Sequence, residues 1–120
     1  MPDQWRRALL RAALREVGYD AIGARGIPEA HAIRPAVTDR GPVRLLIVDQ
    51  TALAGGGISL LRALRDRHQD PATILVARAT VDDPEGPWDQ VLRRPVNIDE
   101  IVTAAGSLVP LPPSARHPLD

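Results

Sequence analysis

The residue of this sequence best placed to do chemistry is an aspartate that ends an apolar segment. Residues 43–48 (VRLLIV) are an almost unbroken apolar run, typical of a buried parallel strand, and Asp49 follows directly. A carboxylate at that strand end lies where open α/β sheets bind ligands, and it can act as a nucleophile. We favour the alternative, an aspartate that ends a strand and is satisfied within the protein, for example by loop amides, because a lone carboxylate binds Mg²⁺ poorly without partner oxygens.

Three other groups of residues have suitable types without suitable spacing. Asp82, Asp83 and Glu85 lie among prolines, which indicates a solvated loop rather than a metal site. The glycines at 55–57 lack the lysine and the spacing of a P-loop, and they fit a flexible lead-in to a helix. The histidines are scattered and cysteine is absent, so we predict no zinc site, no thiol nucleophile and no phosphotransfer histidine.

Helical periodicity appears in several segments that would position Asp49. Apolar residues recur at three- and four-residue steps over 3–17, where Gly18 is the predicted stop, and again over 58–68, which has a basic outer face. A helix that starts near residue 27 must be short or kinked because of Pro35. Asn97 is the predicted N-cap of a last helix that runs to about Leu108, with Glu100 placed to reach back.

Four segments read as strands: 19–24, 43–48, 72–77 and 90–93. The Pro- and Asp-rich stretch 81–89 stands where a further crossover helix would be expected, and no regular helix is predicted there. This order predicts an α/β fold, with one parallel sheet and helices on both faces. We expect one domain over residues 1–109 and a disordered Pro-rich tail over 110–120.

Composition excludes several classes of function. The chain has 120 residues and is 44% hydrophobic, enough for a core without metal or disulfide support. Fifteen arginines balance fifteen acids and aromatic content is 2%, so both the electrostatic attraction and the stacking surfaces of nucleic-acid binders are missing. Arginines interrupt the first segment, which excludes a signal peptide or membrane span there. We expect a soluble, cytoplasmic protein that binds neither nucleic acid nor membrane.

The ordered elements resemble the receiver domain of two-component response regulators, over about residues 3–108. LLIVD is similar to the family's third strand, which ends in the phosphoaccepting aspartate, here Asp49, and Gly57 matches the glycine after the following loop. PATILVAR resembles the fourth strand, and RRPVNIDEIV resembles the fifth strand and last helix, with Arg94 and Pro95 at the family's lysine-proline pair. RRALLRAALREVGYDA resembles the first helix leading into the second strand. The resemblance implies a flavodoxin-like sheet and a role in signalling.

Departures from the family pattern bear on its phosphorylation chemistry. The first strand is absent, so the family's acidic pair leaves at best Asp3 to hold Mg²⁺ together with Asp49. The family's hydroxyl residue is Val76, which has no hydrogen-bond donor. The family's lysine is Arg94, which keeps the charge but differs in reach and geometry, and we expect Arg94 or loop amides to satisfy Asp49. Leu53 replaces the usual proline in the loop, and the fourth helix is degenerate. The resemblance is therefore to a receiver with little or no phosphorylation, and Mg²⁺ is expected only if that chemistry survives.

We prefer a signalling module that is not an enzyme, a pseudo-receiver that binds a protein such as a histidine kinase or another regulator. Trp88 is the candidate contact residue, unless it packs over the sheet edge. The edge left by the missing strand also predicts a homodimer.

Two alternatives stay open. One is an authentic phosphoaccepting receiver that uses Asp49, with a first strand encoded upstream or supplied by another chain through swapping. The other is a nucleotide sensor that uses Arg78, Arg93 and Arg94 at the strand-end crevice.

Overall fold

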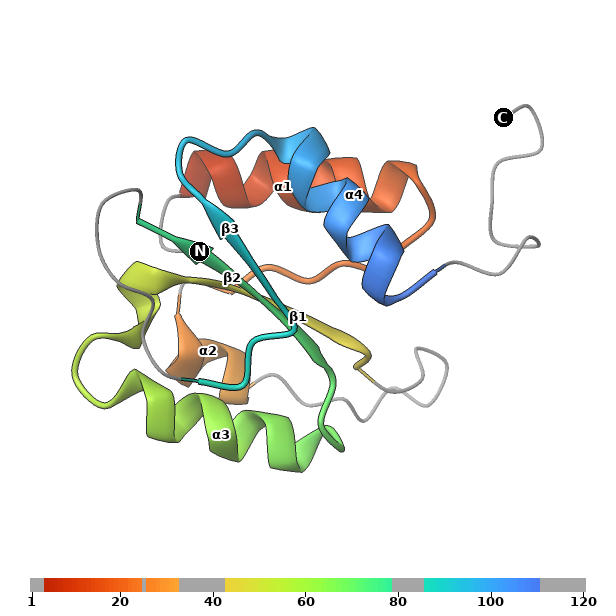
Figure 1. Ribbon diagram of the computed structural model, residues 1–120. Coiled ribbons are helices and arrows are strands. Elements are labelled where there is room, and N and C mark those ends of the chain that lie inside the picture. Colours follow the sequence, from red (N-terminus) through yellow and green to blue (C-terminus); the bar gives the residue numbers. More distant parts are fainter. Residues whose placement is uncertain (1–3, 25, 33–42, 79–85, 111–120) are drawn as a thin grey trace.

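A three-stranded parallel sheet is the centre of the molecule in the computed structural model, which describes residues 4–24, 26–32, 43–78 and 86–110 (Figure 1). The strands are β1 (Leu45–Asp49), β2 (Ala72–Ala77) and β3 (Gln90–Arg93), in the order β1-β2-β3. Ile47 of β1 pairs with Ile74 of β2, and Asp49 pairs with Val76. The predicted strands at 43–48, 72–77 and 90–93 are confirmed.

Helices cover both faces of this sheet, as predicted (Figure 1). On one face lie α1 (Gln4–Glu16) and α4 (Ile98–Leu108), which pack against each other. On the other lie α2 (Ile27–Ala32) and α3 (Gly57–Arg67), and the short 3₁₀ helix η2 (Gln50–Leu53) follows β1. The arrangement is the open, doubly covered α/β sheet that the sequence predicts.

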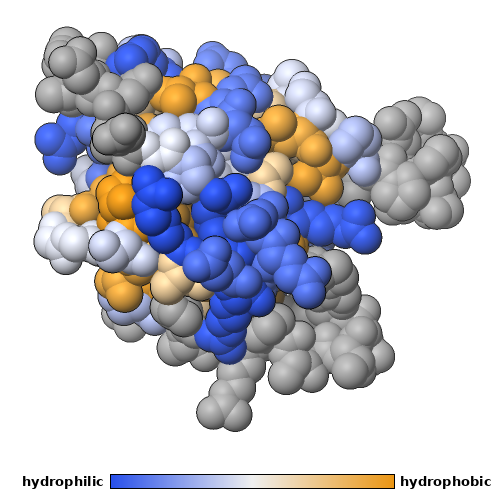
Figure 2. All heavy atoms as spheres, turned by 60° about the horizontal axis from the view of Figure 1, so that its bottom comes forward, coloured by the Kyte–Doolittle hydropathy of each residue, from blue (hydrophilic) through white to orange (hydrophobic). Residues whose placement is uncertain are grey.

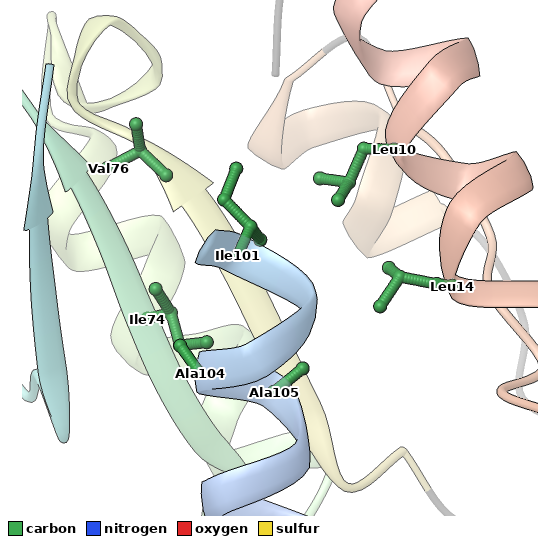
Figure 3. Packing of buried hydrophobic residues seen from close by; sticks show 7 residues of the cluster. All are labelled: Leu10, Leu14, Ile74, Val76, Ile101, Ala104 and Ala105. Carbon is green, nitrogen blue, oxygen red and sulfur yellow. The ribbon is translucent and has the colours of Figure 1, made fainter. Parts of the chain in front are cut away.

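Two apolar clusters hold these layers together. The first joins α1, α4 and β2 (Figure 3), and its buried members are Leu10, Leu14, Ile74, Val76, Ile101, Ala104 and Ala105. The second, on the opposite face, consists of Ile27, Val48 and Leu61 with half-buried neighbours that include Trp88. Because β2 is covered on both faces and paired on both sides, five of its six residues are buried.

Local signals in the sequence account for how the helices begin and end. The Asn97 side chain accepts a hydrogen bond from the Glu100 N–H at 2.8 Å, which confirms the predicted N-cap of α4. Gly18 follows α1 with φ 114°, a conformation that favours glycine. At Gly57 a Cβ atom would come within 2.6 Å of the Ala52 carbonyl oxygen, so only glycine fits where α3 begins.

The predicted strand at 19–24 is wrong, and the described sheet has three strands rather than four. This segment is bound to α1 instead: the Tyr19 N–H donates to the Leu14 carbonyl at 3.0 Å, and the Arg15 Nε donates to the Ala21 carbonyl at 3.1 Å. A strand requires a neighbour that pairs with its backbone, and no strand of the described structure pairs with this segment.

The outer face of α3, which the sequence predicts to be basic, is polar and carries charges of both signs. Figure 2 shows hydrophilic side chains gathered across the middle of this side, with apolar ones beside them. Arg62, Asp66 and Arg67 of α3 are exposed there, while Leu61 and Leu64 point into the protein and are buried.

Two predictions for the loop and the tail lie partly outside the described residues. Residues 86–89 contain no helix, in agreement with the predicted degenerate fourth helix, but Asp82, Asp83 and Glu85 are outside the described part of the chain. The tail from 111 to 120 is outside it as well. None of the helices within the described ranges is long and apolar enough to span a membrane.

Candidate functional site

Asp49 lies where the sequence places it, at the carboxyl end of β1, and its carboxylate is held by the loop that follows. Its side chain is 1% exposed. Oδ1 accepts a hydrogen bond from the Thr51 backbone N–H at 2.9 Å and a second from the Thr51 hydroxyl at 2.7 Å. This Asx-type turn caps η2, and both hydrogen bonds to Oδ1 therefore come from Thr51, two positions along the chain.

Arg94 provides the counter-charge for the other carboxylate oxygen. Its Nη2 forms a hydrogen-bonded ion pair with Oδ2 of Asp49, and the guanidinium is 30% exposed. Arg94 follows β3, so the pair spans the carboxyl end of β2 and joins the two outer strands. The parallel order of the sheet brings these residues together, although 45 positions separate them in the sequence.

The environment stabilises the ionised form of Asp49. Burial alone would raise the pKa of Asp49, because it disfavours the charged form. The two hydrogen bonds from Thr51 and the ion pair with Arg94 act in the opposite direction and prevail, so the pKa of Asp49 lies below its ordinary value. The buried carboxylate is therefore negatively charged near neutral pH, and its charge is neutralised within the protein.

Arg78 and Arg93 also form hydrogen bonds at this edge of the sheet. Arg93 Nη1 donates to the Arg78 carbonyl at 3.3 Å, and the Arg78 N–H donates to the Gln50 side-chain oxygen at 2.7 Å. Together with the Asp49–Arg94 pair, these bonds connect the chain segments that leave the ends of all three strands. Of the three arginines proposed for nucleotide binding, Arg93 and Arg94 use their guanidinium groups in these contacts, whereas Arg78 takes part through its backbone.

The remaining predicted site residues are divided between this edge and the core. Pro95 follows Arg94 through a cis peptide bond. Val76 is paired in register with Asp49, but its side chain is buried in the first apolar cluster. Trp88 is half-buried and packs against the second cluster. This agrees with the second interpretation of Trp88, in which it packs over the sheet instead of contacting a partner.

The described residues around Asp49 do not fit a Mg²⁺ ion. Asp3, the other predicted ligand, lies outside the described residues. Among the described residues no three His, Cys, Asp or Glu side chains are grouped as a metal site. Within the described ranges, Asp49 supplies the carboxylate at the carboxyl ends of the strands, and both of its oxygens are already bonded. The guanidinium on Oδ2 carries the positive charge that a cation would supply. We therefore assign no chemical step to a metal at this site.

Comparison with solved structures shows that this fold is that of response-regulator receiver domains. A Francisella response-regulator receiver domain superimposes with a TM-score of 0.66 at 22% identity, over 89% of each chain. A response regulator from Thermotoga maritima gives 0.68 at 18% identity, over 90% of this chain and 91% of that one. NtrX from Brucella abortus, solved in complex with ADP, gives 0.68 at 19% identity, over 90% of this chain and 24% of NtrX. No protein-family model and no curated protein matches the sequence.

Two residues of the site were missed in the sequence. Thr51 and Gln50 complete the contacts at the end of β1, and neither stands out by residue type. An aspartate followed two positions later by threonine is a known local signal for an Asx turn, and it could have identified Thr51. Gln50 binds a backbone N–H 28 positions away, which only the fold reveals.

Proposed function

We propose that this chain is a receiver-like signalling module that works by binding a partner protein and is neither an enzyme nor efficiently phosphorylated. The observation that carries the proposal is the state of Asp49, whose two carboxylate oxygens are occupied by Thr51 and Arg94. The fold supports a role in signal transduction, because the three solved structures that it resembles are response regulators or their receiver domains.

Phosphoryl transfer to Asp49 would require the site to come apart first. An attacking oxygen has to leave its present hydrogen bonds, and the incoming phosphoryl group needs cations placed around its own oxygens. Arg94 is directed at Asp49 itself, so it neutralises the nucleophile instead of the developing charge. The partner we propose is a signalling protein such as a histidine kinase or another regulator, bound through the surface of the fold.

Intact-mass analysis after incubation with Mg²⁺ and either acetyl phosphate or beryllofluoride tests this proposal. The chain and its Asp49→Asn variant are treated side by side, together with a phosphorylatable receiver domain as positive control. We expect no mass increase in either form while the control receiver is modified. A stoichiometric adduct on the chain that is missing from Asp49→Asn would overturn the proposal and restore the phosphoaccepting alternative.

A second arm identifies the cause of inactivity. If Arg94 blocks the carboxylate, Arg94→Ala should gain a small Asp49-dependent adduct, whereas Arg93→Ala should not, because Arg93 contacts the Arg78 carbonyl and is not the cation on Oδ2. Circular dichroism of each variant establishes that the comparison is between folded proteins. An unmodified, folded Arg94→Ala variant would show that the ion pair is not what prevents the reaction.

A further inference from the structure

One side of β1 carries backbone groups that the described structure leaves without a partner. The Ala72 N–H donates to the Arg44 carbonyl at 3.0 Å, so the backbone of Arg44 faces β2. Backbone groups alternate in direction along a strand, so Leu46 and Val48 also face β2, and Leu45 and Ile47 face away from it. No hydrogen bond to these outward groups is found among the described residues, because β1 is the outer strand of the sheet.

The burial of β1 differs from that of β2, although both strands are strongly apolar. Leu45, Leu46 and Ile47 are half-buried, whereas every β2 residue from Thr73 onward is buried. Edge strands of folded proteins are usually short, charged or interrupted by proline, which prevents them from pairing with other chains. β1 has apolar residues at four of its five positions and no proline, and no described strand pairs with its outer side. It therefore has the features of an edge that accepts another strand.

The neighbourhood of this edge limits the size of what can bind. The chain passes from the first apolar cluster, where Tyr19 packs, to the second, where Ile27 packs against Val48, on the β1 side of the sheet (Figure 1). The part from 19 to 24 is hydrogen-bonded to α1 and not to β1. Because this connection lies on the β1 side of the sheet, a single extended segment, which needs only the width of one strand, is a better fit than a folded domain.

We propose that the outward edge of β1 binds one extended segment of a partner polypeptide, in parallel orientation and over about the five residues of the strand. Helices lie on both faces of the sheet, so the segment is apolar on both of its sides (Figure 1). Arg44 is exposed directly before β1, which favours an acidic residue at the start of the segment. The Pro-rich end of this chain is a poor occupant, because proline lacks the N–H that pairing requires. This site does not involve Asp49, so it stands or falls separately from the proposed function.

Amide hydrogen exchange gives a residue-by-residue test. The probe is a synthetic peptide with one glutamate, five alternating valines and isoleucines, and a polar tail. We expect it to slow exchange at the Leu45 and Ile47 amides by about tenfold or more, with little change at Leu46 and Val48, which already pair with β2. The matched control peptide carries N-methyl groups on alternate backbone nitrogens, so it keeps its side chains but loses the donors of one edge. It should give no slowing.

Three results would overturn the proposal. Equal slowing by both peptides would show that side chains, not the strand edge, cause binding, and no slowing at saturating peptide would show that the edge does not bind. If exchange at the Leu45 and Ile47 amides slows as the protein concentration rises without any peptide, and sedimentation detects dimers, the edge binds a second copy of the chain.

A variant pair gives an independent measurement. Both Leu45→Pro and Leu45→Ala lose the leucine side chain, but only Leu45→Pro also loses the outward N–H. Proline is tolerated at this position because Leu45 is the first residue of an edge strand. We expect Leu45→Pro to bind the peptide at least about tenfold more weakly than Leu45→Ala. Equal binding would contradict the inference. If the Leu46 amide of Leu45→Pro exchanges faster than in the wild type, the strand itself is disturbed. In that case the comparison of the two peptides tests the inference instead.

Discussion

The end of β1 and its outer side differ sharply in how their polar groups are satisfied. At the end, both oxygens of the Asp49 carboxylate have donors, and the charge is neutralised by Arg94. Along the side, the backbone groups of Leu45 and Ile47 find no partner in the described structure. The carboxylate at the strand end is thus saturated with protein contacts, while the outer side of the same strand has unpaired backbone groups among the described residues. The two proposals made above therefore concern different parts of one strand.

The largest expected effect compares two isoleucines that are paired in register on neighbouring strands. Ile74 of β2 is fully buried, and Ile74→Ala should lower the free energy of unfolding by about 4 kcal/mol through lost burial and a cavity. Ile47 of β1 is half-buried, so Ile47→Ala should cost about 1–2 kcal/mol. Urea denaturation followed by circular dichroism measures both. Equal losses would mean that β1 is enclosed as β2 is, and the contrast between edge and centre would be lost.

The ion pair comes next in size. Arg94→Ala leaves the buried Asp49 carboxylate without its counter-charge, and we expect a loss of about 2–3 kcal/mol, less than for a fully buried pair because Arg94 is partly exposed. The matched control is Arg93→Ala, an exposed arginine of the preceding position, for which we expect less than about 1 kcal/mol. If the two variants were equally stable, the pair would not be what holds the strand ends together.

The hydroxyl of Thr51 should contribute less than Arg94. Thr51→Val keeps the shape and the backbone N–H but removes the 2.7 Å hydrogen bond to Oδ1, at an expected cost of about 1 kcal/mol. Thr51→Ser retains the hydroxyl and should recover most of this loss. Chemical denaturation of the three proteins in one buffer checks the order. A serine variant as unstable as the valine variant would point to the methyl group rather than the hydrogen bond.

How far the sequence predicts this molecule depends on the range of the interactions involved. The apolar runs at 43–48 and 72–77 predict the strands β1 and β2, and the Asn97 N-cap follows from a local hydrogen bond, because each signal lies within a few residues. The prediction for 19–24 is wrong because a strand exists only when a neighbour pairs with it, and no strand among the described residues pairs with this segment. The Asp49–Arg94 pair was anticipated from the family order of elements, while the Gln50–Arg78 contact depends on the fold alone.

The smallest expected effect is a pH dependence that isolates Asp49. Its folded pKa lies below its ordinary value of 3.8, so the folded state binds this proton less readily than the unfolded state does. The stability that Asp49 contributes is therefore complete well above pH 3.8, declines as the pH falls through that value, and is lost below the folded pKa. One carboxylate can add at most about 1.4 kcal/mol per pH unit to the slope.

Asp49→Asn separates this contribution from that of every other acid. The variant should be less stable by a constant offset at neutral pH, because Arg94 loses its ion pair and asparagine carries no charge. The difference in unfolding free energy between the two proteins should then shrink as the pH drops below 3.8, since the wild type alone loses the Asp49 contribution there. Urea titrations between pH 3 and pH 6 measure that difference. A difference that stays constant across this range would mean that the Asp49 carboxylate is not stabilised in its charged form, and the closed end of β1 would have no electrostatic basis.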